Sequence, residues 1–155
     1  MEPEILIRAA TLSDIDEIGK LFDLYRQFYA QPADPKRARA FISARLSKGE
    51  SVVLVAHPSA SPLLLGFTQL YPTFCSVSAA PIFVLYDLFV SPDARRAGVG
   101  RALLKAAADY AGTTDAVRVE LATAKTNHAA QTLYRSLGWV RDDAFDRYSL
   151  AVPGK

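Results

Sequence analysis

The chain has 155 residues, of which 50% are hydrophobic and 22% are charged, a composition typical of one ordinary globular domain. Eighteen basic and sixteen acidic residues give a formal net charge of +2. The basic residues are scattered, which does not favour nucleic acid or an anionic membrane as a partner. The longest apolar run, residues 82–90, contains Asp87 and is far shorter than the ~20 residues of a membrane-spanning helix. We therefore expect a single domain over residues 1–155, with no nucleic-acid or membrane partner.

Cysteine and histidine usage points away from a disulfide and from a metal site. Cys75 is the only cysteine, so an internal disulfide cannot form, and residues 1–10 lack the basic and apolar regions of a signal peptide. Both features predict a cytoplasmic protein. His57 and His128 lie far apart and lack the neighbouring cysteines or carboxylates of a metal site, so no metal is expected.

The first part of the chain predicts one strand followed by two helices. Residues 4–10 form a short run of the branched apolar residues that favour strands. Residues 11–29 repeat apolar side chains at helical spacing, which predicts a long amphipathic helix. A second helix is expected over residues 34–49, with Asp34 as its N-cap and Gly49 at its end.

The rest of the chain predicts strands alternating with two more helices. Residues 51–57, 62–74 and 81–90 are rich in branched and aromatic residues, and short turn sequences separate them. The remaining expected elements are a helix ending near residue 110, a strand over residues 116–123, a helix over residues 127–137 and two short strands over residues 139–141 and 145–152. This order predicts an α/β fold with a mixed sheet of about six to seven strands and about four helices on both faces.

Residues 90–104, "VSPDARRAGVGRALL", join an apolar strand to a helix through a polar turn that contains two glycines. Successive backbone N–H groups in such a turn, followed by a helix N-terminus, form a site for phosphate. Arg95, Arg96 and Arg101 add positive charge. A P-loop fits poorly because the segment has no Gly-Lys-Ser/Thr sequence, and a dinucleotide fingerprint fits poorly because position 103 is leucine and the strand lies late in the chain.

This segment resembles the cofactor motif of the GNAT superfamily of N-acetyltransferases, in which a Val-x-Pro turn precedes [RQ]-x-x-G-x-[GA] at a helix start. Arg95, Gly98 and Gly100 occupy its fixed positions. A second family block matches "TAKTNHAAQTLYRSLGW" at Asn127, Ala130, Leu133, Tyr134, Gly138 and Trp139. The resemblance extends over nearly the whole chain, and "VLYDLFVSP" is locally similar to the diamine acetyltransferase branch.

The resemblance implies an enzyme that uses acetyl-CoA as co-substrate and needs no metal. The pyrophosphate is expected on the N–H groups of residues 96–100, with the pantetheine arm paired like an extra strand beside residues 88–90. A backbone N–H of those strand residues is expected to support the oxyanion. The expected acetyl-CoA-binding residues are Leu88, Phe89, Val90, Arg95, Arg96, Ala97, Gly98, Val99, Gly100, Arg101, Asn127 and Ala130.

The resemblance also implies two catalytic groups, Tyr134 and Asp87. Tyr134 corresponds to the family's usual proton donor to the departing CoA thiolate. Asp87 is the candidate base, although the diamine branch has an acidic pair here and Tyr86 replaces its first member. Neighbouring strand residues face opposite sides, so if Asp87 is the buried one, Tyr86 lines the acceptor pocket and a water relays the proton. Glu120 is a second candidate base.

The acceptor pocket of such a fold is built largely from the first two helices, where Tyr25, Arg26 and Tyr29 lie, and Tyr86 completes the expected set. Aromatic residues with a few polar groups suit a small primary amine, either polyamine-like or an amino acid. Arg26 repels a polycation and attracts a carboxylate. The alternatives are a protein N-terminal or other macromolecular acetyltransferase and a non-catalytic acyl-CoA-binding regulator. A homodimer is compatible with the resemblance.

Overall fold

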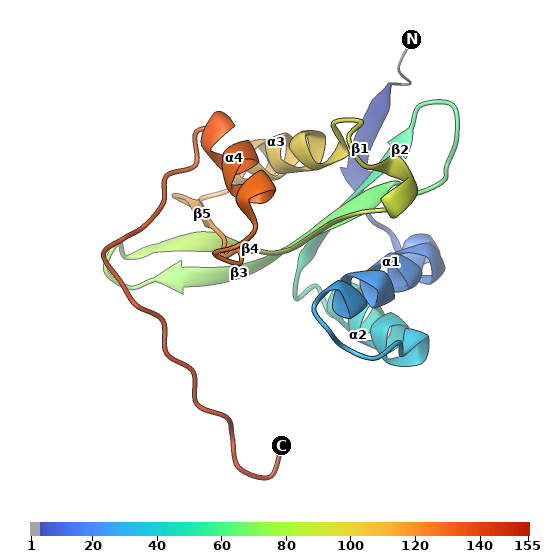
Figure 1. The fold of residues 1–155 in the computed structure, drawn as a ribbon. Coiled ribbons are helices and arrows are strands. Elements are labelled where there is room, and N and C mark those ends of the chain that lie inside the picture. The colour runs from blue at the N-terminus through green and yellow to red at the C-terminus, as the bar shows by residue number, and fades with distance from the viewer. Residues whose placement is uncertain (1–3) are drawn as a thin grey trace. The chain divides into compact units, whose positions relative to one another are not determined.

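The computed structural model describes residues 4–155, which divide into two compact units, one ending at Ala122 and the other spanning Thr123–Lys155 (Figure 1). The first unit contains a five-stranded sheet of order β1-β2-β3-β4-β5. The strands are β1 (Ile5–Ala9), β2 (Val52–Pro58), β3 (Gly66–Cys75), β4 (Ala80–Val90) and β5 (Val119–Glu120). Neighbouring strands from β1 to β4 are antiparallel, whereas β4 and β5 are parallel.

Helices cover both faces of this sheet. Helices α1 (Ile15–Phe28) and α2 (Pro35–Ser47) lie on one face and α3 (Val99–Gly112) on the other (Figure 1). The apolar stripe of α1 packs on the sheet in a core that includes Phe67 and Phe89. Asp34 caps α2 by accepting a hydrogen bond from the Arg37 N–H at 3.1 Å, as its sequence position predicts.

The second unit contains helix α4 (His128–Ser136). The Asn127 side chain accepts a hydrogen bond from the Ala130 N–H at 3.2 Å and so caps this helix. The helix ends before Gly138, whose φ of +89° lies in the left-handed region that favours glycine. The rings of Tyr134 and Trp139 lie 6.0 Å apart, measured between centroids.

The predicted mixed α/β fold and its four helices are confirmed, but the sheet has five strands, not about six to seven. The strand expected over residues 116–123 contains only Val119–Glu120. The two strands expected over residues 139–141 and 145–152 are wrong, because these residues form no strand and follow an extended path (Figure 1). The intervening stretch is rich in aspartate, which disfavours strands, and the Ala144 N–H donates to the Asp142 carboxylate at 2.8 Å in a local turn.

Two features of the β3–β4 pair determine where β4 places its side chains. The register shifts between Gln69 and Leu70, so that Tyr86 is the extra residue of a β-bulge. At the other end of the pair the backbones approach closely, because a Cβ at Gly66 would lie 2.6 Å from the Phe89 carbonyl oxygen. Only glycine fits there without displacement of β4.

We predict that Gly66→Ala lowers the free energy of unfolding by about 2 kcal/mol, because the added methyl group meets backbone atoms that cannot rotate away. Unfolding in urea provides the measurement. Gly112→Ala is the matched control, since its Cβ would meet nothing within 4 Å. Equal stability of the two variants would contradict the steric role of Gly66.

Candidate active site

The turn between β4 and α3 forms a cradle of backbone N–H groups. Arg96 and Gly98 both have left-handed backbone conformations, with φ of +67° and +80°. No side chain caps the N-terminus of α3, as far as the structure describes the chain. Alternation of left-handed and ordinary residues turns successive N–H groups toward one space, and the helix dipole makes that space favourable for an anion. The predicted phosphate site rests on this backbone arrangement and stays a prediction.

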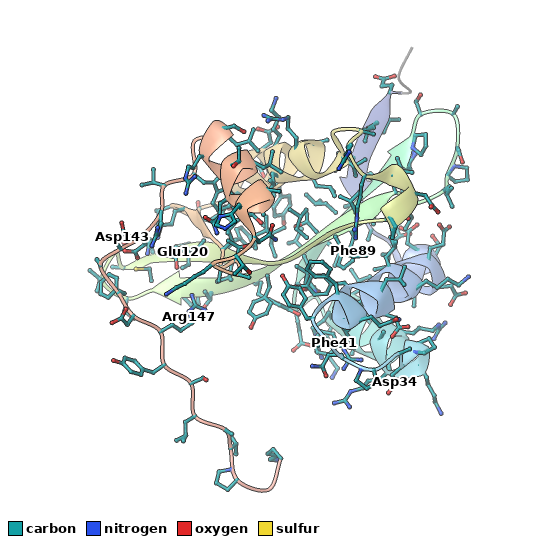
Figure 2. All side chains as sticks on the ribbon, viewed as in Figure 1. Asp34, Phe41, Phe89, Glu120, Asp143 and Arg147 are labelled. Atoms are coloured by element: carbon teal, nitrogen blue, oxygen red, sulfur yellow. The ribbon has the colours of Figure 1, made fainter. Side chains whose placement is uncertain are left out.

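Arg95 connects this cradle to the end of β4. Its Nε donates a hydrogen bond to the Val90 carbonyl oxygen at 3.2 Å, and its guanidinium carbon lies 5.4 Å from the centroid of the Phe89 ring (Figure 2). Its charge is therefore held close to the strand end, although the side chains of both Arg95 and Arg96 are exposed.

One edge of β4 is partly open. Strand β5 pairs with β4 only at Phe83 and Val84. Among the described residues up to Ala122, no strand pairs with the edge of residues 85–90 that faces away from β3. The resemblance implies that a pantetheine arm lies beside residues 88–90 on this edge, and that placement stays a prediction.

Asp87 is the buried member of the Tyr86–Asp87 pair. Its exposed fraction is 4%, against 64% for Tyr86. Gln69 Nε2 donates to the Asp87 carboxylate at 2.6 Å, and the Ser51 hydroxyl in turn donates to Gln69 Oε1 at 2.7 Å. Burial raises the pKa of Asp87, although hydrogen bonds from Gln69 and Tyr25 oppose the shift.

Tyrosine rings surround the exposed side of this point in β4. The Tyr25 hydroxyl donates to the Tyr86 carbonyl oxygen at 3.2 Å, and the Tyr25 ring lies 5.1 Å from that of Tyr29. The Tyr71 ring packs edge-on against Tyr86 at 5.6 Å. Burial and then the charge of Asp87 raise the pKa of Tyr25, and the same causes raise the pKa of Tyr71 to about 12. Both phenols are therefore protonated at neutral pH.

The structure brings Tyr25, Tyr29 and Tyr86 together, as expected, but places Arg26 beside other residues. Arg26 lines a cavity of about 280 Å³ together with Phe22, Arg37 and Phe41. Arg37 and Phe41 were not predicted as site residues, because only the packing of α2 on α1 reveals their position. Gln69 and Tyr71 were also missed. The polar residues Thr68 and Gln69 interrupt an apolar strand sequence, and this interruption could have indicated that Gln69 is a site residue.

The remaining candidates have separate surroundings. The Glu120 carboxylate on β5 accepts a hydrogen bond from Arg118 Nε at 2.6 Å, and both side chains are nearly half exposed (Figure 2). Asn127, Ala130 and Tyr134 belong to the unit Thr123–Lys155 and are described only within it.

No cluster of side chains that could hold a metal ion occurs within residues 4–155. None of the helices in that range is long and apolar enough to cross a membrane.

The comparisons with known proteins assign this mixed sheet, with its open edge of β4 and its turn before α3, to an acetyltransferase. Residues 18–139 match the Acetyltransferase (GNAT) family, so the chain belongs to this family. The expected family, fold class and enzyme class are thereby confirmed. Enzymes of this family use acetyl-CoA. Similarity to the diamine branch stays a prediction.

Individual relatives agree with this assignment. The chain is 48% identical over 149 residues to "Uncharacterized N-acetyltransferase YhfO" of Bacillus subtilis (strain 168), covering 96% of this chain and 99% of the relative. A solved "probable acetyltransferase" superposes with a TM-score of 0.90 at 38% identity, covering 97% of this chain and 99% of the other. Ribosomal-protein-alanine N-acetyltransferase from Brucella melitensis biovar Abortus 2308 superposes with a TM-score of 0.79 at 20% identity, covering 96% of this chain and 99% of the other. The last likeness concerns the fold alone.

We predict that Gly98→Val raises the Kd for CoA by about 10- to 100-fold, the loss expected when one or two hydrogen bonds to a charged phosphate are weakened. Isothermal titration calorimetry gives the Kd. Gly49→Val is the matched control, because Gly49 also has a positive φ and open space at its Cβ but lies at the end of α2. Gly98→Val and Gly49→Val should lose similar stability. Equal CoA affinity of these two variants would contradict the assignment of the cradle as the phosphate site.

Proposed function

We propose that the protein transfers the acetyl group of acetyl-CoA to the primary amine of a small molecule, by direct attack in a ternary complex. The observation that carries the donor assignment is the junction of β4 with α3, where an open strand edge is followed, after the turn of residues 91–98, by a helix start that no side chain caps. Cytoplasmic location and dimerisation stay predictions.

The donor would be held mainly by backbone groups. The N–H groups of residues 96–100 would bind the pyrophosphate, because amides approach a diphosphate more closely than side chains do. The pantetheine arm would lie along residues 88–90, and a strand N–H would donate to the oxyanion of the tetrahedral intermediate. Fixing donor and amine together supplies much of the rate enhancement.

Proton transfer would involve Asp87 and Tyr134. An alkylammonium group, with a pKa near ~10.4, must lose a proton before attack. Asp87 is buried while Tyr86 is exposed, which supports a water that relays this proton to the carboxylate. The raised pKa of Asp87 makes it a better proton acceptor than an ordinary aspartate. Tyr134 would protonate the departing thiolate.

Thiol release from acetyl-CoA tests the proposal when it is measured with polyamines, amino acids, aminoglycosides and N-terminal peptides. We expect turnover with a small amine. Turnover of peptides alone would favour the macromolecular alternative, and tight CoA binding with no turnover would favour the regulatory one. Tyr134→Phe should lower kcat about 100-fold without changing the Kd for CoA, whereas Tyr148→Phe, which alters an exposed ring, should change neither.

We predict that Asp87→Asn lowers kcat about 100-fold and leaves stability at pH 7 equal or higher. The raised pKa means that Asp87 stabilises the folded protein most below pH ~4 and that this contribution is lost as pH rises through the folded-state pKa. The stability difference in favour of asparagine should therefore appear above pH ~4.

Steady-state rates and urea unfolding at pH 4 and pH 7 measure the two effects of Asp87→Asn. Glu120→Gln is the control, because it removes an exposed, ion-paired carboxylate. An unchanged rate in Asp87→Asn, together with a large loss in Glu120→Gln, would assign the base to Glu120.

A further inference from the structure

A cavity of about 280 Å³ lies between α1 and α2 and combines two aromatic rings with two guanidinium groups. Each helix contributes a phenylalanine and an arginine four residues apart, a spacing that places both on one side of a helix. Phe22 and Arg26 come from α1, whereas Arg37 and Phe41 come from α2, on which Figure 2 labels Phe41. The two rings stack with centroids 5.5 Å apart and an interplanar angle of 15°.

Arg26 has an unsatisfied hydrogen-bond donor beside this cavity. Its Nη1 is buried and has no partner among the residues that the structure describes. The nearest carboxylate in sequence, Asp23, lies one helical turn away but is already engaged. One of its oxygens accepts from the Asp34 N–H at 2.8 Å, and the other accepts from Gln27 Nε2 at 3.1 Å. A buried donor without a partner is unfavourable, and an anionic acceptor would satisfy it.

Among residues 4–155, Arg37 lacks the ion pair that each of the other two arginines of α2 forms. Of the three arginines of that helix, Arg39 pairs with Asp16 at 2.7 Å and Arg45 pairs with Glu50 at 3.1 Å. Arg37 forms no ion pair within the described part of the chain. The two arginines that line the cavity are thus left without carboxylates, whereas the two others on α2 have them.

We propose that this cavity binds the carboxylate of the acceptor, so that the substrate is an amino acid or another amine that carries a carboxylate. This inference rests on the proposed function and narrows its acceptor to amines that carry a carboxylate. A guanidinium matches the two oxygens of a carboxylate with paired donors, and the rings of Phe22 and Phe41 cover adjacent carbon atoms. Two unpaired positive charges disfavour a polyamine.

Aromatic packing connects the cavity to the point where the amine would react. Phe22 lines the cavity and stacks on Tyr25 with ring centroids 6.0 Å apart. The Tyr25 hydroxyl donates to the backbone of Tyr86 on β4. Phe22 therefore lies between the cavity and the tyrosine rings around β4, so the proposal places the carboxylate on the cavity side of Phe22 and the amine on the tyrosine side.

Matched pairs of acceptors that differ only in the carboxylate provide the first test. Lysine and cadaverine, 4-aminobutyrate and propylamine, and phenylalanine and phenethylamine are compared in the thiol-release assay. We expect the carboxylate-bearing member of the accepted pair to have a kcat/KM about 10- to 100-fold higher, as for hydrogen bonds to a charged group. Equal or faster turnover of the amines without carboxylate would overturn the proposal.

Arginine variants provide the second test. Arg26→Lys and Arg37→Gln should raise the KM of the carboxylate-bearing acceptor about 10- to 100-fold and leave kcat nearly unchanged. The KM of an amine without carboxylate should not rise. Arg39→Gln is the control, because Arg39 lies on the same helix but pairs with Asp16. An unchanged KM in both cavity variants would contradict the assignment.

Binding measured without turnover separates failure of this inference from failure of the proposed function. The ¹⁵N resonances of arginine side chains are followed during titration with acetate and, separately, inorganic phosphate. Saturable shifts of the arginine resonances with acetate that disappear in Arg37→Gln would support carboxylate binding in the cavity. If the same protein acetylated no amine, the small-amine function would be rejected while the cavity assignment stood. A response to phosphate only, or no response, would overturn the inference.

Discussion

The close approach of β3 to β4 at Gly66 is the constraint on which the donor site depends. A Cβ on this residue would lie 2.6 Å from the Phe89 carbonyl oxygen and 3.3 Å from a methyl group of Val99, the first residue of α3. One glycine therefore sets the distance between the end of the sheet and the start of the helix. The N–H cradle lies between these two points, so its shape follows from backbone packing and needs no ligand to form it.

The second organising feature is the buried polar chain from Ser51 through Gln69 to Asp87. An isolated carboxylate inside an apolar sheet is unfavourable, and the hydrogen bonds that Asp87 accepts offset only part of that penalty. Packing of the sheet does not require the buried carboxylate of Asp87. Retention of such a group is expected where a raised pKa serves chemistry, because packing alone would favour an apolar residue.

Local features of the sequence predicted most of the fold and the donor cradle. Apolar spacing predicted α1, Asp34 predicted the start of α2, and the two glycines at positions 98 and 100 predicted a turn that leads into α3. Features that depend on partners distant in sequence were not predictable. Periodicity cannot show that Tyr86 forms a bulge, that Gln69 meets Asp87, or that Arg26 lacks a carboxylate, because each outcome depends on which segments pack together. The prediction of two terminal strands was wrong for the same reason, because a strand forms only when it pairs with another strand.

The bulge at Tyr86 has a consequence for how the protein behaves among other chains. A strand edge that accepts a ligand's amide groups is also able to accept an unrelated strand, which is a route to aggregation. A bulge increases the local twist and interrupts the regular spacing of N–H and C=O groups along β4. The irregular spacing at Tyr86 therefore makes the open edge of β4 a poor template for pairing with other strands.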